Sequence, residues 1–81
     1  MAMNVKVRLF GTLGKKFPDH DPLNGFEIEI PEEATVGDLL DQLDIAKSKI
    51  GLVSVQGRQV KAGKILRPGD FVRIFRPIFG G

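Results

Sequence analysis

The spacing of the apolar residues constrains the fold of this chain most, because it changes from a period of two to a helical period and back again. Over residues 4–10, valine and leucine alternate with other side chains, which indicates a half-buried strand. A second alternation runs over residues 26–30, and we expect Pro31 to close it because proline cannot donate to a strand ladder. Two such strands joined by the intervening loop favour an antiparallel hairpin.

The next segment has the pattern of a short amphipathic helix. Thr35 is expected to cap its start, and Asp38, three residues later, completes a capping-box pair. The apolar residues that follow at helical spacing are Val36, Leu39, Leu40 and Leu43. Residues 45–50 are expected to add one further turn.

The second half of the chain returns to strands. An apolar strand is expected over residues 52–55, followed by a turn at Gly57-Arg58 and a short return segment around Val60. Residues 67–70 have the composition of a turn and lead directly into a final strand over residues 71–76. The order of elements predicts an α+β domain with one main helix packed on a mixed sheet of four to five strands. With the first and last strands as central neighbours, this arrangement is the β-grasp, or ubiquitin-like, fold.

Composition excludes several kinds of chemistry. The 81 residues include no cysteine, which excludes disulfides, thiolate zinc sites and a cysteine nucleophile. A single histidine and the small size argue against a stand-alone enzyme and favour a binding or carrier module. Residues 1–46 carry four basic and nine acidic side chains, whereas residues 47–81 carry eight basic and one acidic. Without a long apolar stretch or a signal-peptide pattern, we expect no membrane partner and a cytoplasmic location.

Three motifs that resemble binding sites are better explained otherwise. His20 lies in an Asp-His-Asp loop and would be an isolated metal ligand, and Asp38, Asp41 and Asp44 suit the start and outer face of a helix. The stretch 11–16 lacks the spacing of a phosphate-binding loop. We therefore expect no metal and no cofactor bound by this chain.

The last five residues of the sequence begin with Pro77 and finish with Gly80-Gly81. Proline ends strand pairing, and two residues without side chains let an extended tail enter a narrow channel. The sequence thus predicts a folded domain over residues 1–76 and a flexible tail over residues 77–81. An alternative is a frayed end in which the glycines have no role.

The pattern Asp70-x-Val72-x-x-Phe75-x-Pro77-x-x-Gly80-Gly81 resembles the C-terminal signature of the MoaD/ThiS family of ubiquitin-like sulfur carriers. The stretches 5–11, 13–17 and 34–40 also resemble that family, in the same order. The resemblance implies that an E1-like enzyme uses ATP to adenylate the Gly81 carboxylate. A sulfur donor then displaces AMP and leaves a thiocarboxylate. The match is nearest to the small subunit of molybdopterin synthase, whose large subunit would be a further partner.

A docking surface for the activating enzyme follows from strand alternation. If Val72 and Ile74 point into the core, Phe75 and Arg73 point outward, and the same rule places Phe10 outward on the first strand. We expect Phe10 and Phe75 to form an apolar patch with Arg73 and Arg76 at its rim. The family resemblance supports an aromatic role at Phe75. The partner is also expected to grip Phe79 in the tail.

Other functions remain open at this level. Arg76-Pro77 is also similar to the carrier for thiamin thiazole synthesis, in which the sulfur would go to the thiazole of thiamin and thiazole synthase would be the partner. A third alternative is that the chain is a protein modifier, which is conjugated to lysines through Gly81. The basic second half would suit RNA, although no stacking groove is evident and we do not expect nucleic acid as a partner. Finally, the chain could be a structural subunit whose tail only fills a pocket.

Overall fold

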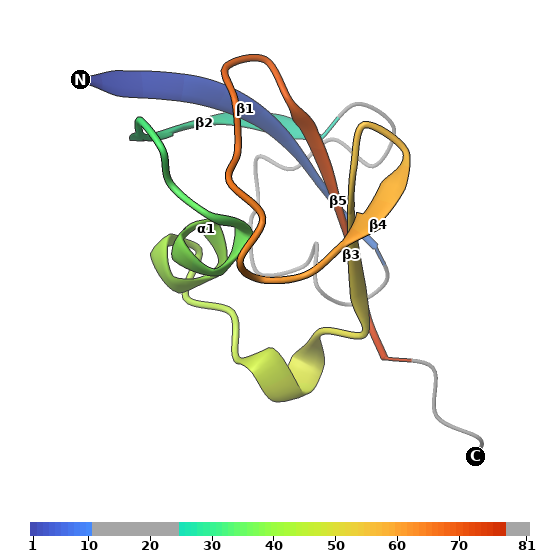
Figure 1. Cartoon of the computed structure of the whole chain (residues 1–81). Helices are drawn as coiled ribbons and strands as arrows, with labels where there is room; N and C mark the ends of the chain where they lie inside the picture. The colour runs from blue at the N-terminus through green and yellow to red at the C-terminus, as the bar shows by residue number, and fades with distance from the viewer. Residues whose placement is uncertain (11–24, 78–81) are drawn as a thin grey trace.

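The structure, a computed structural model, describes residues 1–10 and 25–77. Within these residues, five strands form one sheet in the order β2-β1-β5-β3-β4. The elements along the chain are β1 (Ala2–Leu9), β2 (Phe26–Pro31), α1 (Val36–Gln42), the 3-10 helix η2 (Lys47–Lys49), β3 (Leu52–Val55), β4 (Arg58–Val60) and β5 (Phe71–Phe75). Figure 1 shows α1 on one side of the sheet. The predicted α+β, β-grasp architecture is confirmed.

The two strands from opposite ends of the chain are central neighbours, as expected. β1 pairs with β5 in parallel, with Lys6 opposite Phe71 and Leu9 opposite Ile74, and it pairs with β2 antiparallel. On its other side, β5 pairs antiparallel with β3. β5 is therefore the middle strand of the sheet, and Arg76 and Pro77 follow directly from it.

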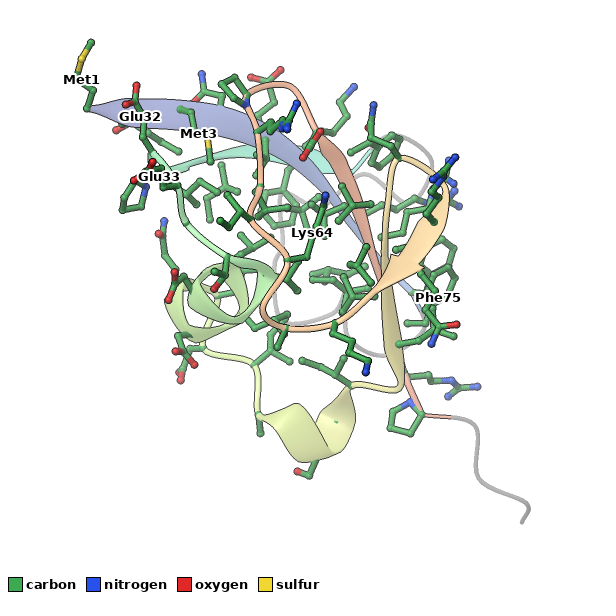
Figure 2. The ribbon with its side chains drawn as sticks, viewed as in Figure 1. Met1, Met3, Glu32, Glu33, Lys64 and Phe75 are labelled. Atoms are coloured by element: carbon green, nitrogen blue, oxygen red, sulfur yellow. The ribbon has the colours of Figure 1, made fainter. Side chains whose placement is uncertain are left out.

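The helix begins where the sequence predicted, through a capping box at Thr35 and Asp38. The backbone N–H of Asp38 donates to the Thr35 hydroxyl at 3.2 Å, and the Thr35 N–H donates to the Asp38 carboxylate at 2.9 Å. The next two N–H groups donate to the chain that follows β4: Val36 to the Lys64 carbonyl at 2.9 Å and Gly37 to Ala62 at 2.8 Å. Figure 2 shows Lys64 beside α1. The segment after β4 thereby fixes the start of the helix.

The core lies between α1 and the face of the sheet that the helix covers. Val7, Leu39, Val72 and Ile74 are each 0% exposed, so β1, β5 and α1 all contribute its centre. The other apolar residues of this cluster are Met3, Val5, Leu9, Ile30, Ala34, Val36, Leu40, Leu43, Ile45, Val53, Val55 and Leu66. Burial of this set at about 25 cal/mol per Å² of apolar surface is the main source of stability in a domain without cysteine.

Several boundaries differ from the expectation by one or two residues. β1 begins at Ala2 rather than at residue 4, and β2 includes Pro31, which pairs with Ala2. Proline is tolerated there because β2 is an edge strand and the ladder continues through the Glu32 N–H, which donates to the Met1 carbonyl at 3.1 Å. β5 ends at Phe75, so Arg76 lies outside the strand.

The turn between β3 and β4 consists of Gln56 and Gly57, and Arg58 is already the first residue of β4. Both have positive φ, 52° and 83°, as a type I′ hairpin turn requires. Gln56 accepts a hydrogen bond from the Phe71 N–H through its side-chain oxygen at 2.7 Å, and its own N–H donates to the Phe71 carbonyl at 3.0 Å. Asparagine, the usual residue in such turns, is one methylene shorter, so the side-chain bond explains the glutamine.

Candidate docking surface and base of the C-terminal tail

The middle strand presents two chemically different faces. Val72 and Ile74 are buried beneath the helix, whereas Phe71, Arg73 and Phe75 are only half-buried and alternate with them on the other face. The predicted assignment of inward and outward residues on β5 is therefore confirmed. Figure 2 shows Phe75 on the side of the sheet away from α1.

The fold brings together two of the predicted surface residues, Phe10 and Phe75. Their ring centroids are 4.3 Å apart and the ring planes are inclined by 16°, so the rings are stacked. The parallel pairing continues to this point, because the Phe10 N–H donates to the Ile74 carbonyl at 3.1 Å. On the other side of β5, Leu52 lies opposite Phe75 and is also half-buried. The end of the sheet nearest the tail thus carries an aromatic and aliphatic patch.

Cationic side chains lie on aromatic rings along the same face. The Arg73 guanidinium lies 4.8 Å from the Phe71 ring centroid, and the Arg8 guanidinium lies 4.5 Å from that of Phe10. The Lys6 ammonium is 6.0 Å from the Phe71 ring. Cations at these distances are attracted to the ring by its quadrupole. Strand alternation predicted Phe71, Lys6 and Arg8 on this outer face, as the structure has them, but none of the three was part of the predicted docking surface.

Arg73 has an unsatisfied donor. Its Nε atom is buried and has no hydrogen-bond partner among the described residues. A buried donor without a partner costs about 1–3 kcal/mol relative to a satisfied one, and more when the group is charged. By contrast, Arg76 is exposed and lies beyond the end of β5. The two predicted rim arginines therefore have different environments.

The base of the tail is held against a glycine. The Gly51 N–H donates to the Phe75 carbonyl at 2.7 Å. A Cβ atom placed on Gly51 would lie 2.6 Å from the Arg76 carbonyl oxygen and 2.7 Å from the Pro77 Cα. Only glycine permits this approach, which sets the direction in which the chain leaves the sheet.

A hollow of about 420 Å³ lies at this point, lined by Ile50, Gly51, Leu52, Phe75, Arg76 and Pro77. Sequence reasoning missed Gly51, although a glycine immediately before a predicted strand is a signal for close backbone approach. The predicted residues Phe79, Gly80 and Gly81 lie outside the described part of the chain, as does His20. The division into a domain and a tail stays a prediction.

The described residues hold no group of three or more histidine or acidic side chains that could bind a metal ion. Asp38 is instead part of the helix cap. In the same part of the chain, no helix has the length and apolar character needed to cross a membrane.

Comparison with solved structures places the fold among known proteins. The chain matches the HVO 2177 protein of Haloferax volcanii at 24% identity and a TM-score of 0.78, covering 99% of this chain and 88% of that one. It matches a putative molybdopterin converting factor, subunit 1, from Pyrococcus furiosus at 25% identity and a TM-score of 0.75, covering 94% and 99%. The small archaeal modifier protein 1 of H. volcanii is 22% identical with a TM-score of 0.74, and the match covers 94% of this chain and 99% of that one.

These likenesses, with the described fold, define a ubiquitin-like β-grasp protein. A search of curated proteins returned no match. A family model described as Mut7-C ubiquitin matches residues 2–80, and the chain belongs to that family.

Proposed function

We propose that this chain is a sulfur carrier whose Gly81 carboxylate is adenylated by an E1-like enzyme and converted to a thiocarboxylate that donates sulfur in molybdopterin synthesis. The observation that carries the proposal is that β5 leads, along the sequence of a ubiquitin-like protein, into Pro77 and a terminal Gly-Gly. The likeness to the molybdopterin converting factor subunit from P. furiosus, over nearly the whole of both chains, supports the choice of pathway.

The chemistry needs little from this chain beyond a presented carboxylate. A carboxylate oxygen of Gly81 attacks the α-phosphorus of ATP on the enzyme, and pyrophosphate leaves. A sulfur nucleophile then attacks the acyl carbon and AMP departs, which is a far better leaving group than oxide. The chain acts as substrate and carrier rather than as catalyst, and ATP is bound by the activating enzyme. Because the chain has no cysteine, it has no thiol on which to carry a persulfide.

The docking surface for the activating enzyme is the Phe10–Phe75 stack with Arg73 and Arg76. It lies at the same end of the sheet as the base of the tail, because Phe75 is the last residue of β5 and Pro77 follows it by two. An enzyme that holds this patch therefore holds the chain close to the tail that it must activate. Phe79 is a further contact for the enzyme within the tail, and the reaction takes place in the cytoplasm.

A second candidate function is protein modification, in which Gly81 forms an isopeptide bond with a lysine. The likenesses to the small archaeal modifier protein 1 and to Urm1 from Trypanosoma brucei favour it. Both functions begin with adenylation of the same carboxylate, so they share the docking surface. They differ in whether the acyl group is transferred to sulfur or to a lysine amine.

The intact mass of the chain after incubation with ATP, an E1-like enzyme from the same source and sulfide tests the proposal. A gain of about 16 mass units, the difference between sulfur and oxygen, is expected and should be lost when Gly81 is deleted. Separate incubation with a molybdopterin synthase large subunit and with a thiazole synthase then identifies the acceptor. Conjugates to lysines without the 16-unit species would favour the modifier. If the chain instead binds RNA in a salt-dependent way that survives deletion of Gly80-Gly81, the carrier proposal is wrong.

A further inference from the structure

We infer that the sheet face around Arg73 receives a carboxylate from the activating enzyme, so that the docking surface extends from the Phe10–Phe75 stack along β1 and β5. The inference rests on the proposed function, since it specifies the chemistry of that enzyme's surface. The partner is a protein that presents an aspartate or glutamate beside an apolar contact.

The register concentrates positive charge at this place. Arg8 and Arg73 are opposite each other on the parallel strands β1 and β5, and Ser54 is opposite Arg73 on β3. Like charges directly opposite each other on one face destabilise a sheet. The nearest acidic residue in register is Glu27, which lies opposite Lys6 on the edge strand and is separated from β5 by β1. Among the described residues, neither β1 nor β3 therefore places a carboxylate in register with Arg73.

Arg73 itself is prepared for an anionic partner. Its guanidinium is held at 4.8 Å from the Phe71 ring, which restricts its orientation. Its Nε is buried, and no residue in the described ranges 1–10 and 25–77 accepts a hydrogen bond from it. A carboxylate binds a guanidinium through two parallel N–H donors, and the Nε edge is one of the edges that offers such a pair. A modest movement of the guanidinium over the ring, made when the enzyme docks, would present Nε to the incoming oxygen.

The same face is poorly suited to RNA. Single-stranded nucleic acid is bound by aromatic rings whose faces are open to bases. Here Phe10 is stacked on Phe75, and the ring of Phe71 is already covered by Arg73, with Lys6 nearby. An apolar patch that adjoins a polar and charged area is instead the composition of a protein interface.

Three variants test the inference in the activation assay, with kcat and KM for the chain measured separately. Arg73→Met keeps the stem over the ring but removes the charge and the donors. Arg73→Lys keeps the charge without the planar fork. Arg58→Met is the control for net charge, because Arg58 is exposed on β4 at the far edge of the sheet. Urea unfolding of each variant checks that the fold is unchanged.

We expect Arg73→Met to raise KM about tenfold with kcat nearly unchanged, since the contact forms on docking and is not part of the reaction. Arg73→Lys should recover part of the loss, and Arg58→Met should match the wild type. The wild-type KM should also rise more steeply with salt than that of Arg73→Met.

An unchanged KM in Arg73→Met, while the wild-type chain is activated normally, would overturn this inference and leave the proposed function intact. Failure of an active enzyme to modify the wild-type chain would overturn both. Binding of a single-stranded RNA oligonucleotide that is lost in Arg73→Met would assign the face to nucleic acid and overturn the inference.

Discussion

Phe10 stacks on Phe75 with ring centroids 4.3 Å apart, although the two residues come from the beginning and the end of the chain. The parallel pairing of β1 with β5 produces this contact, because it runs Phe10 alongside the last residues of β5. The rings therefore act as one surface. A change in either residue should alter the environment of the other.

Substitution of the stacked rings should weaken activation more than it weakens the fold. Phe10→Ala and Phe75→Ala should each raise KM for the activating enzyme about tenfold, because each removes part of one apolar contact. In the double variant the effects should be less than additive. A double-mutant cycle on urea unfolding should give a coupling energy of about 0.5–1.5 kcal/mol between the rings. Full additivity in KM would show that the enzyme contacts the rings independently.

The second prediction concerns Gly51. Gly51→Ala should displace Arg76 and Pro77, because the new methyl group would collide with backbone atoms rather than with a flexible side chain. The free energy of unfolding should fall by about 1–3 kcal/mol, as for overpacked sites. Hydrogen exchange of the residue 51 amide should accelerate because its bond to the Phe75 carbonyl is strained, and kcat for activation should fall.

Gly63→Ala is the matched control for Gly51→Ala, since a Cβ at Gly63 would meet no atom within 4 Å. That variant should unfold at the same urea concentration as the wild type or slightly higher. Equal effects of the two substitutions on kcat would remove any role for Gly51 in directing the tail.

The third prediction separates turn preference from a specific hydrogen bond at Gln56. Asparagine suits positive φ better than glutamine does, yet Gln56→Asn should be less stable by about 0.5–1.5 kcal/mol because the shorter side chain loses the Phe71 N–H. Gln56→Glu keeps the length and an acceptor oxygen and should stay close to the wild type. A Gln56→Asn variant as stable as the wild type in urea would show that turn preference, and not the side-chain hydrogen bond, determines the stability at this position.

The fourth prediction concerns the helix cap. Thr35→Ala should destabilise the domain by about 1 kcal/mol because the Asp38 N–H loses its acceptor, whereas Thr35→Ser keeps it. Thermal unfolding by circular dichroism measures both. If Thr35→Ser and Thr35→Ala destabilise the domain equally, the loss comes from the packing of the threonine methyl group rather than from the cap.

The order of elements was predictable because the spacing of apolar residues within each short segment indicates whether it is a strand or a helix. The alternation in β1 and β5 and the capping pair at Thr35 depend on neighbours close in sequence, so local patterns suffice. The start of β1 at Ala2 was not predictable, since it depends on pairing with the end of β2. Boundaries of this kind are set by a partner strand and not by the segment itself.

The candidate site divides in the same way. Alternation placed Phe10, Arg73 and Phe75 on the outer face, and the structure bears this out. A glycine before a strand signals close backbone approach, but the sequence does not say that Gly51 approaches Arg76 and Pro77, because that contact depends on the exit of a strand more than twenty residues later. Likewise, the buried Nε of Arg73 depends on how its side chain lies against Phe71, and no sequence pattern specifies that arrangement.

The central position of β5 has a consequence for synthesis of the chain. Until β5 has emerged from the ribosome, β1 and β3 have no strand between them, and the sheet cannot close. Folding therefore waits for contacts between the first and the last strands, which are distant in sequence and slow to form. A chain cut short before residue 71 would lack the middle of its sheet and its terminal glycines together. Truncated products that end before β5 should thus be degraded as unfolded chains.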